Sequence, residues 1–178
     1  LGSCLLAAGQ AQSALGALRR TVALRPDHGR AWRELGDALQ SQREFAAAIP
    51  CYQRAARLGP DEPEVWYGLG RAQAACGENA VAAAAFARCT ALDPRHAAAL
   101  HEYGKACFEL GCVERAMVLL REALAIGNDE VRRRALENLA ILVPGSPHDD
   151  PHSILATRQA YARTRPERPR PWPPRGPR

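Results

Sequence analysis

"WRELGDALQSQREFAAAIPCYQRAARLGP" occupies residues 32–60, and a shift of 34 residues brings it onto "WYGLGRAQAACGENAVAAAAFARCTALDP" at residues 66–94. Both stretches open on Trp, have Leu-Gly at the fourth and fifth places, and end on Pro. Self-similarity at one fixed period predicts a repeat architecture in which each unit is one supersecondary element.

The same spacing continues through most of the chain. Columns of small residues, large apolar residues and prolines recur at this interval: Ala14, Ala48, Ala82 and Ala116; Leu18, Tyr52, Phe86 and Leu120; Pro26, Pro60 and Pro94. A fourth column holds Gly9, Arg43, Gly77 and Gly111. We expect each unit to be two antiparallel helices, with the glycine column at the turn between them and the proline after the second helix.

Such a hairpin cannot bury its own apolar face, so its stability depends on stacking against the next one. We expect four large residues to lie between neighbouring helix pairs: Trp32, Tyr52, Trp66 and Phe86. Asp61, followed by Pro63 and Glu64, has the pattern of a capped helix start.

The pattern Trp32-x-x-Leu35-Gly36…Ala48…Tyr52-x-x-Ala55…Pro60 resembles the tetratricopeptide repeat. The resemblance covers roughly residues 1–128 and implies an all-α fold, a right-handed superhelical solenoid of antiparallel helix pairs with a 34-residue period. Leu1-Gly2 lies in the Leu-Gly column. We therefore expect the chain to begin inside the first helix of a truncated repeat, followed by three further repeats, and not in a signal peptide.

The composition agrees with close-packed helices and argues against two classes of partner. Hydrophobic residues make up 47% of the 178 residues but aromatic residues only 6%, and no apolar run approaches the ~18 residues that cross a bilayer. The net charge of +5 comes from residues 157–178, which hold seven Arg against one Glu. We therefore expect no specific nucleic-acid binding and no membrane insertion. The sequence does not indicate an oligomeric state.

Six cysteines are present without a C-x-x-C motif: Cys4, Cys51, Cys76, Cys89, Cys107 and Cys112. We expect them to fill gaps between helices in a reducing cytoplasm, with a disulfide or a metal site as the alternative. "PHDDPH" at residues 147–152 offers possible metal ligands, but a polar linker whose Asp150 caps a helix starting at Pro151 is the simpler interpretation. We expect no cofactor and no metal, and no catalytic motif is visible.

Helix positions that face the concave side of such a stack predict a peptide-binding groove. The expected groove residues are Arg33, Asp37, Tyr67, Arg71, His101, Lys105 and Phe108. Arg33, Arg71 and Lys105 would be basic anchors and Tyr67 an aromatic contact. The alternative is a solvated polar face without a ligand.

The repeat register ends near Asn128. We expect a capping helix at residues 129–143, a linker with a short helix at residues 144–164, and a disordered Arg/Pro-rich tail at residues 165–178.

Residues 135–162, "ALENLAILVPGSPHDDPHSILATRQAYA", are similar to the repeat-to-catalytic-domain junction of bacterial SPINDLY-like proteins, relatives of the O-linked N-acetylglucosamine transferases. This resemblance implies a parent protein that transfers a sugar from UDP-GlcNAc to protein Ser or Thr. The sequence thus predicts a protein-interaction scaffold. The alternative is the substrate-recognition arm of such a glycosyltransferase, so whether the parent protein is an enzyme stays open.

Overall fold

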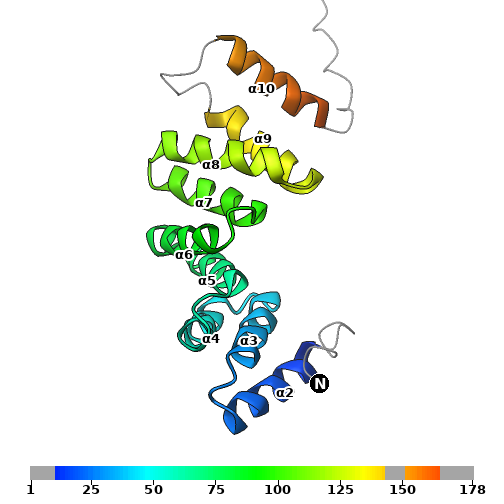
Figure 1. The fold of residues 1–178 in the computed structure, drawn as a ribbon. Helices are drawn as coiled ribbons and strands as arrows, with labels where there is room; N and C mark the ends of the chain where they lie inside the picture. Colours follow the sequence, from blue (N-terminus) through cyan, green and yellow to red (C-terminus); the bar gives the residue numbers. More distant parts are fainter. Residues whose placement is uncertain (1–10, 143–150, 165–178) are drawn as a thin grey trace, which may run out of the picture.

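The computed structural model describes residues 11–142 and 151–164, and Figure 1 shows them as a stack of helices. Within these ranges every regular element is an α-helix: α2 (Ala11–Leu24), α3 (Gly29–Ser41), α4 (Phe45–Leu58), α5 (Pro63–Ala75), α6 (Asn79–Leu92), α7 (Ala97–Glu109), α8 (Val113–Ile126), α9 (Asp129–Leu142) and α10 (Pro151–Thr164). The predicted all-α solenoid of antiparallel helix pairs is confirmed. None of these helices is long and apolar enough to cross a membrane.

Each helix packs chiefly against its neighbours along the chain. The hairpins are α3 with α4, α5 with α6, and α7 with α8, while α2 packs on α3, α9 packs on α8 and α10 packs on α9. The first helices of successive hairpins also touch one another, α3 to α5 and α5 to α7. Helices that approach most closely line the inner side of a curved stack, so α3, α5 and α7 form its inner layer.

Helix starts are capped by residues that the sequence analysis did not single out. His28 and His96, two periods apart, accept hydrogen bonds at Nδ1 from the backbone N–H groups of Ala31 (3.3 Å) and Ala99 (3.1 Å). The prediction that Asp61 caps a helix is wrong. The residue before Pro63 is Glu62, which makes no capping bond, and the Asp61 carboxylate lies 3.7 Å from Arg88.

The turns inside the hairpins require a left-handed backbone, as predicted from the glycine column. Gly77 and Gly111 have φ of 83° and 79°, and Arg43 takes the same conformation at 63°. In each turn the N–H of the residue that directly follows the left-handed one bonds back to a carbonyl of the preceding helix, as Cys112 does to Cys107 at 2.9 Å. This is the helix-ending motif that favours glycine.

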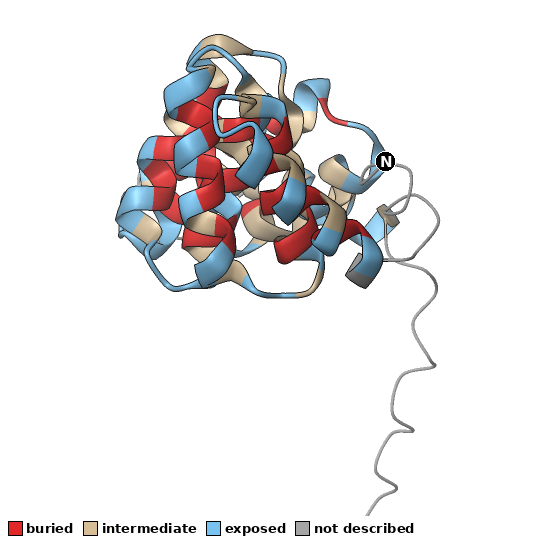
Figure 2. Cartoon of the chain, turned by 90° about the horizontal axis from the view of Figure 1, so that it is seen from below, coloured by how far each residue is buried: buried red, intermediate tan, exposed pale blue. Residues whose placement is uncertain are grey.

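Large side chains fill the space between the helices, as predicted. Tyr52 and Phe86 are fully buried. The Tyr52 ring lies against Gly36 of its own hairpin and Gly68 of the next, since a β-carbon at either glycine would come within 3 Å of the ring. Trp32 and Trp66 are half-buried against the cluster around Ala55 and Ala56. Figure 2 shows the buried residues on the facing sides of the helices.

The expectation for the cysteines is correct for part of the set. Cys51, Cys89 and Cys107 are buried between helices. Cys76 and Cys112 are exposed, because they lie at the hairpin turns and not on a packed helix face. Cys4, the Asp150 cap, the start of the first helix and the predicted disordered tail all lie outside the described residues.

Candidate peptide-binding groove

The inner surface between α5 and α7 contains an open pocket of about 370 Å³. Its apolar wall consists of Phe45, Ala74, Ala75 and Ala106. Its polar residues are Arg71, Asn79, Glu102, Lys105 and Glu109. The pocket therefore places two cations and two carboxylates around a small apolar floor.

The charged residues of α7 lie on one stripe of that helix. Glu102, Lys105 and Glu109 are separated by three and four residues, the spacing at which side chains share a helix face. Lys105 and Glu109 are exposed, and Lys105 makes no ion pair within the described residues. Arg71 faces this stripe from α5. Two predicted groove residues, Arg71 and Lys105, are thus brought together.

Arg71 is positioned by an aromatic side chain. Its guanidinium carbon lies 5.6 Å from the centroid of the Tyr67 ring, within the range of a cation–π contact. The Tyr67 ring in turn packs against His96, with centroids 4.7 Å apart, and against Phe86 at 6.2 Å. Burial raises the pKa of Tyr67 above its usual 10.0. Tyr67 supports the groove from below and does not line it.

Arg33 and Asp37 are engaged in a structural network. Arg33 Nη1 lies 3.0 Å from Asp37 Oδ2, and the Tyr52 hydroxyl donates to Asp37 Oδ1 at 2.8 Å. Gln40 extends the network to the next hairpin by donating to the Gly68 carbonyl at 3.4 Å. Burial raises the pKa of Asp37 above 3.8, although the hydrogen bond from Tyr52 and the charge of Arg33 oppose the rise. This network therefore joins α3 to α4 of the same hairpin and to α5 of the next one.

His101 is only 3% exposed and lies between α7 and α9. Its Nε2 is 3.1 Å from Asn138 Nδ2 and its Nδ1 is 3.4 Å from Glu102 Oε1. A neutral ring with its proton on Nδ1 satisfies both partners, since Nδ1 donates to Glu102 and Nε2 accepts from Asn138. Arg134 Nη2 approaches the same Glu102 oxygen at 3.4 Å. His101 therefore fastens α9 to the stack.

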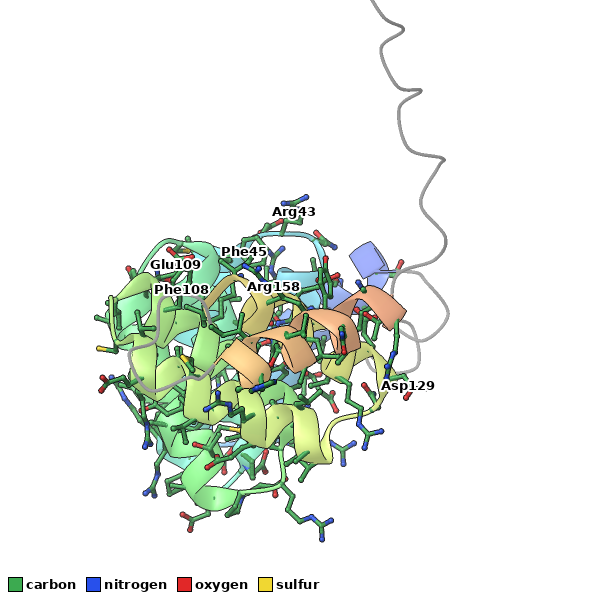
Figure 3. All side chains as sticks on the ribbon, turned by 90° about the horizontal axis from the view of Figure 1, so that it is seen from above. Arg43, Phe45, Phe108, Glu109, Asp129 and Arg158 are labelled. Carbon is green, nitrogen blue, oxygen red and sulfur yellow. The ribbon has the colours of Figure 1, made fainter. Side chains whose placement is uncertain are left out.

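Phe108 is 40% exposed and does not line the pocket. Looking down the stack, Figure 3 shows Phe108, Glu109 and Phe45 at the same edge of the molecule. Within residues 11–142 and 151–164, no three His, Cys, Asp or Glu residues are arranged to hold a metal ion. Most of the "PHDDPH" stretch lies outside these ranges.

The sequence matches the tetratricopeptide repeat family over residues 1–63, 34–88 and 67–131. The chain belongs to this family. No curated protein matches the sequence. Several solved tetratricopeptide repeat structures resemble the whole fold, at sequence identities that show the fold alone.

Three of these structures illustrate the likeness. The crystal structure of MamA is 18% identical, covers 92% of each chain and has a TM-score of 0.80. MamA from Desulfovibrio magneticus RS-1 is 15% identical over 92% of this chain and 88% of its own, with a TM-score of 0.78. YrrB is 15% identical over 93% of this chain and 84% of its own, with a TM-score of 0.76, and is described as a tetratricopeptide repeat protein with an unusual peptide-binding site.

Besides three alanines, sequence reasoning missed four larger residues of the pocket in this tetratricopeptide repeat array: Phe45, Asn79, Glu102 and Glu109. The two glutamates share the helical stripe of Lys105, so their spacing was a usable signal. Phe45 and Asn79 begin the second helices of two successive hairpins. Only the stacking of the hairpins brings them to the inner surface.

Proposed function

We propose that the protein is an interaction scaffold that binds an extended segment of a partner protein in the groove between α5 and α7. The observation that carries the proposal is the pocket that collects Arg71, Lys105, Glu102 and Glu109 around an apolar floor. A peptide offers both charged side chains and apolar ones, so this lining is complementary to a peptide with mixed character.

Two features support the groove as a binding surface. Tyr67 holds the Arg71 guanidinium in place through a ring contact, which reduces the side-chain entropy lost on binding. Lys105 and Glu109 are exposed and so remain accessible to a ligand. Arg33, Asp37 and His101 make structural contacts, so we assign ligand recognition to the α5–α7 part of the groove.

The test is the double variant Arg71→Ala, Lys105→Ala, with peptides first selected on the wild-type protein from a random peptide library. We expect the selected peptides to bind the variant at least tenfold more weakly in fluorescence-anisotropy titrations, because two charge-assisted contacts are lost. The matched control is Arg95→Ala, Arg132→Ala, which removes two exposed arginines outside the pocket. Equal affinity for all three proteins would exclude this groove.

We further propose that the protein functions in the cytoplasm. The five described cysteines are free, and Cys76 and Cys112 are exposed. Exposed thiols without a bonded partner are typical of a reducing compartment.

A second candidate is that the chain is the substrate-recognition arm of a UDP-GlcNAc-dependent protein glycosyltransferase. What supports it is that four residues of the junction resemblance, Glu137, Asn138, Ala140 and Arg158, line one pocket of about 640 Å³ between α9 and α10. A coding sequence for a nucleotide-sugar-binding domain downstream of Tyr161 is the expected finding. If the downstream sequence encodes none in any reading frame, this candidate is excluded.

A further inference from the structure

The outer surface formed by α2 and α4 is strongly basic. Neither helix contains an Asp or a Glu, and their four arginines, Arg19, Arg20, Arg54 and Arg57, are all exposed. No ion pair engages any of the four within the described part of the chain. Their charges therefore face solvent without an internal counter-charge.

A pocket of about 470 Å³ lies in this basic surface, between the α2–α3 loop and the outer side of α4. Pro26, Trp32 and Pro50 form its apolar part, and Arg54 and Arg57 lie at its rim. None of its residues lines the α5–α7 groove. The two pockets share no residue and are separate surfaces.

The apolar part of this pocket is rigid. Trp32 Nε1 donates a hydrogen bond to the Pro26 carbonyl at 3.0 Å, so the polar tip of the indole is satisfied internally. The ring is half-buried against the cluster of Ala55, Ala56 and Val65. Pro50 stands inside α4, where proline has no N–H to donate to the preceding turn. Its ring and the indole present fixed apolar surface to an incoming side chain.

We propose that this outer surface is a second docking site, independent of the groove, for an acidic protein segment that inserts one apolar side chain beside Trp32. Charge complementarity gives the acidic character, because Arg54 and Arg57 line the pocket and make no ion pair within the described residues. The fixed Trp32–Pro50 walls give the apolar anchor, since a pocket of this size and lining takes a side chain.

The surroundings of Cys51 support the same location for the positive charge. Burial raises the pKa of the Cys51 thiol, and the neighbouring Arg19 opposes the rise. Arg19 of α2 is thus close to the α4 residue that lines the pocket. Nucleic acid fits this surface less well, because stacking of bases needs a free aromatic face and the Trp32 ring is half-buried.

The experiment uses the whole chain and a fluorescein-labelled peptide of Glu and Asp residues with one central Leu, titrated by fluorescence anisotropy. We expect the charge-reversal variant Arg54→Glu, Arg57→Glu to bind the probe at least tenfold more weakly than the wild-type chain. A matched control, Arg95→Glu, Arg132→Glu, makes the same change in net charge at exposed positions away from the pocket and should bind within twofold of wild type. Replacing the central Leu of the probe by Ser should weaken binding to the wild type.

The groove variant Arg71→Ala, Lys105→Ala separates this proposal from the proposed function, because it should leave binding of the acidic probe unchanged. Equal probe affinity for wild type and Arg54→Glu, Arg57→Glu would overturn the proposal, as would the absence of binding to wild type. A single-stranded oligonucleotide or vesicles with phosphatidylserine that bind tighter than the peptide, with the same loss in the variant, would overturn the assignment to a protein segment.

Discussion

A missing side chain at Gly68 decides one of the closest contacts in the molecule. A β-carbon at this position would lie 2.5 Å from Cε1 of Tyr52, so only glycine lets the Tyr52 ring lie against the next hairpin. The same ring fills the space beside Gly36 of its own hairpin. Gly36 belongs to the Leu-Gly column of the repeat, whereas Gly68 is outside that column, and the contact of each glycine with the Tyr52 ring was recognisable only from the packing.

Arg43 offers a test of how much stability a residue other than glycine costs at the hairpin turn. It adopts a φ of 63°, where Gly77 and Gly111 stand in the equivalent turns. Since a left-handed conformation costs a residue with a β-carbon about 1 kcal/mol, we expect Arg43→Gly to raise the free energy of unfolding by about 0.5–1 kcal/mol. Urea denaturation followed by circular dichroism measures the change. The reciprocal variant Gly77→Ala should lower stability by a similar amount, and a stabilising effect there would contradict the argument.

At the scale of the helices, hydrogen bonds and ion pairs join helices that also pack against each other through apolar side chains. Asp37 links α3 to Tyr52 of α4, and Glu102 links His101 of α7 to Arg134 of α9. Burial raises the pKa of Asp37. Burial acts in the same direction on Glu102, but the hydrogen bond to His101 and the nearby positive charges outweigh it, so its pKa lies below 4.5.

These opposite shifts predict opposite responses to acid. A carboxyl with a lowered pKa contributes stability that is present above pH 4.5 and is lost as the pH falls through its folded-state value. The advantage of wild type over Glu102→Gln should therefore shrink in acid. A carboxyl with a raised pKa disfavours its own ionisation in the folded state. Wild type should consequently gain stability relative to Asp37→Asn as the pH falls towards 3.8. Urea midpoints across this range check both signs, and a parallel pH response of the two pairs would refute the assignment.

Over the whole molecule, contacts are made between neighbouring helices, so stability is a sum of local terms along the stack. The buried residues at the α8–α9 end form one cluster, which contains Leu120, Leu139 and Leu142. The cluster at the other end, around Leu35 and Tyr52, shares no residue with it. A substitution that destabilises one end should therefore leave the backbone amides at the other end protected from hydrogen exchange.

Leu139→Ala tests this separation. Leu139 is 2% exposed, so the substitution should cost about 2–5 kcal/mol, as other large-to-small changes in cores do. In native-state hydrogen exchange we expect faster exchange of amides in α8 and α9 and unchanged exchange in α3 and α4. The control is Ile141→Ser on the same helix, where the side chain is 69% exposed and an effect within about 0.5 kcal/mol is expected. A uniform rise in exchange over all helices would show that the stack unfolds as one unit.

The groove residues show which features of the site could be predicted from the sequence and which could not. Periodicity placed Arg71 and Lys105 on the same side of the stack, because a residue's place in the repeat fixes its helix face, and both residues line one pocket. The pairing of Arg33 with Asp37 was readable from their four-residue spacing but was not predicted. The burial of His101 under α9 could not be predicted, since it depends on which helix packs against α7. The binding role of the seven predicted residues stays a prediction.

By itself the sequence determined the period, the helix pairs, the positions of the turns and the large residues between the hairpins. These features follow from patterns that can be read along the chain: the spacing of apolar residues, the glycines and prolines at helix ends, and a unit that must stack to bury its apolar face. Only the tertiary structure decided which charged side chains pair between helices, which are buried and which face solvent. Pairs four residues apart, such as Arg33 with Asp37, follow from helical spacing, but a pair such as Arg134 with Glu102 joins different helices and forms only when those helices pack together.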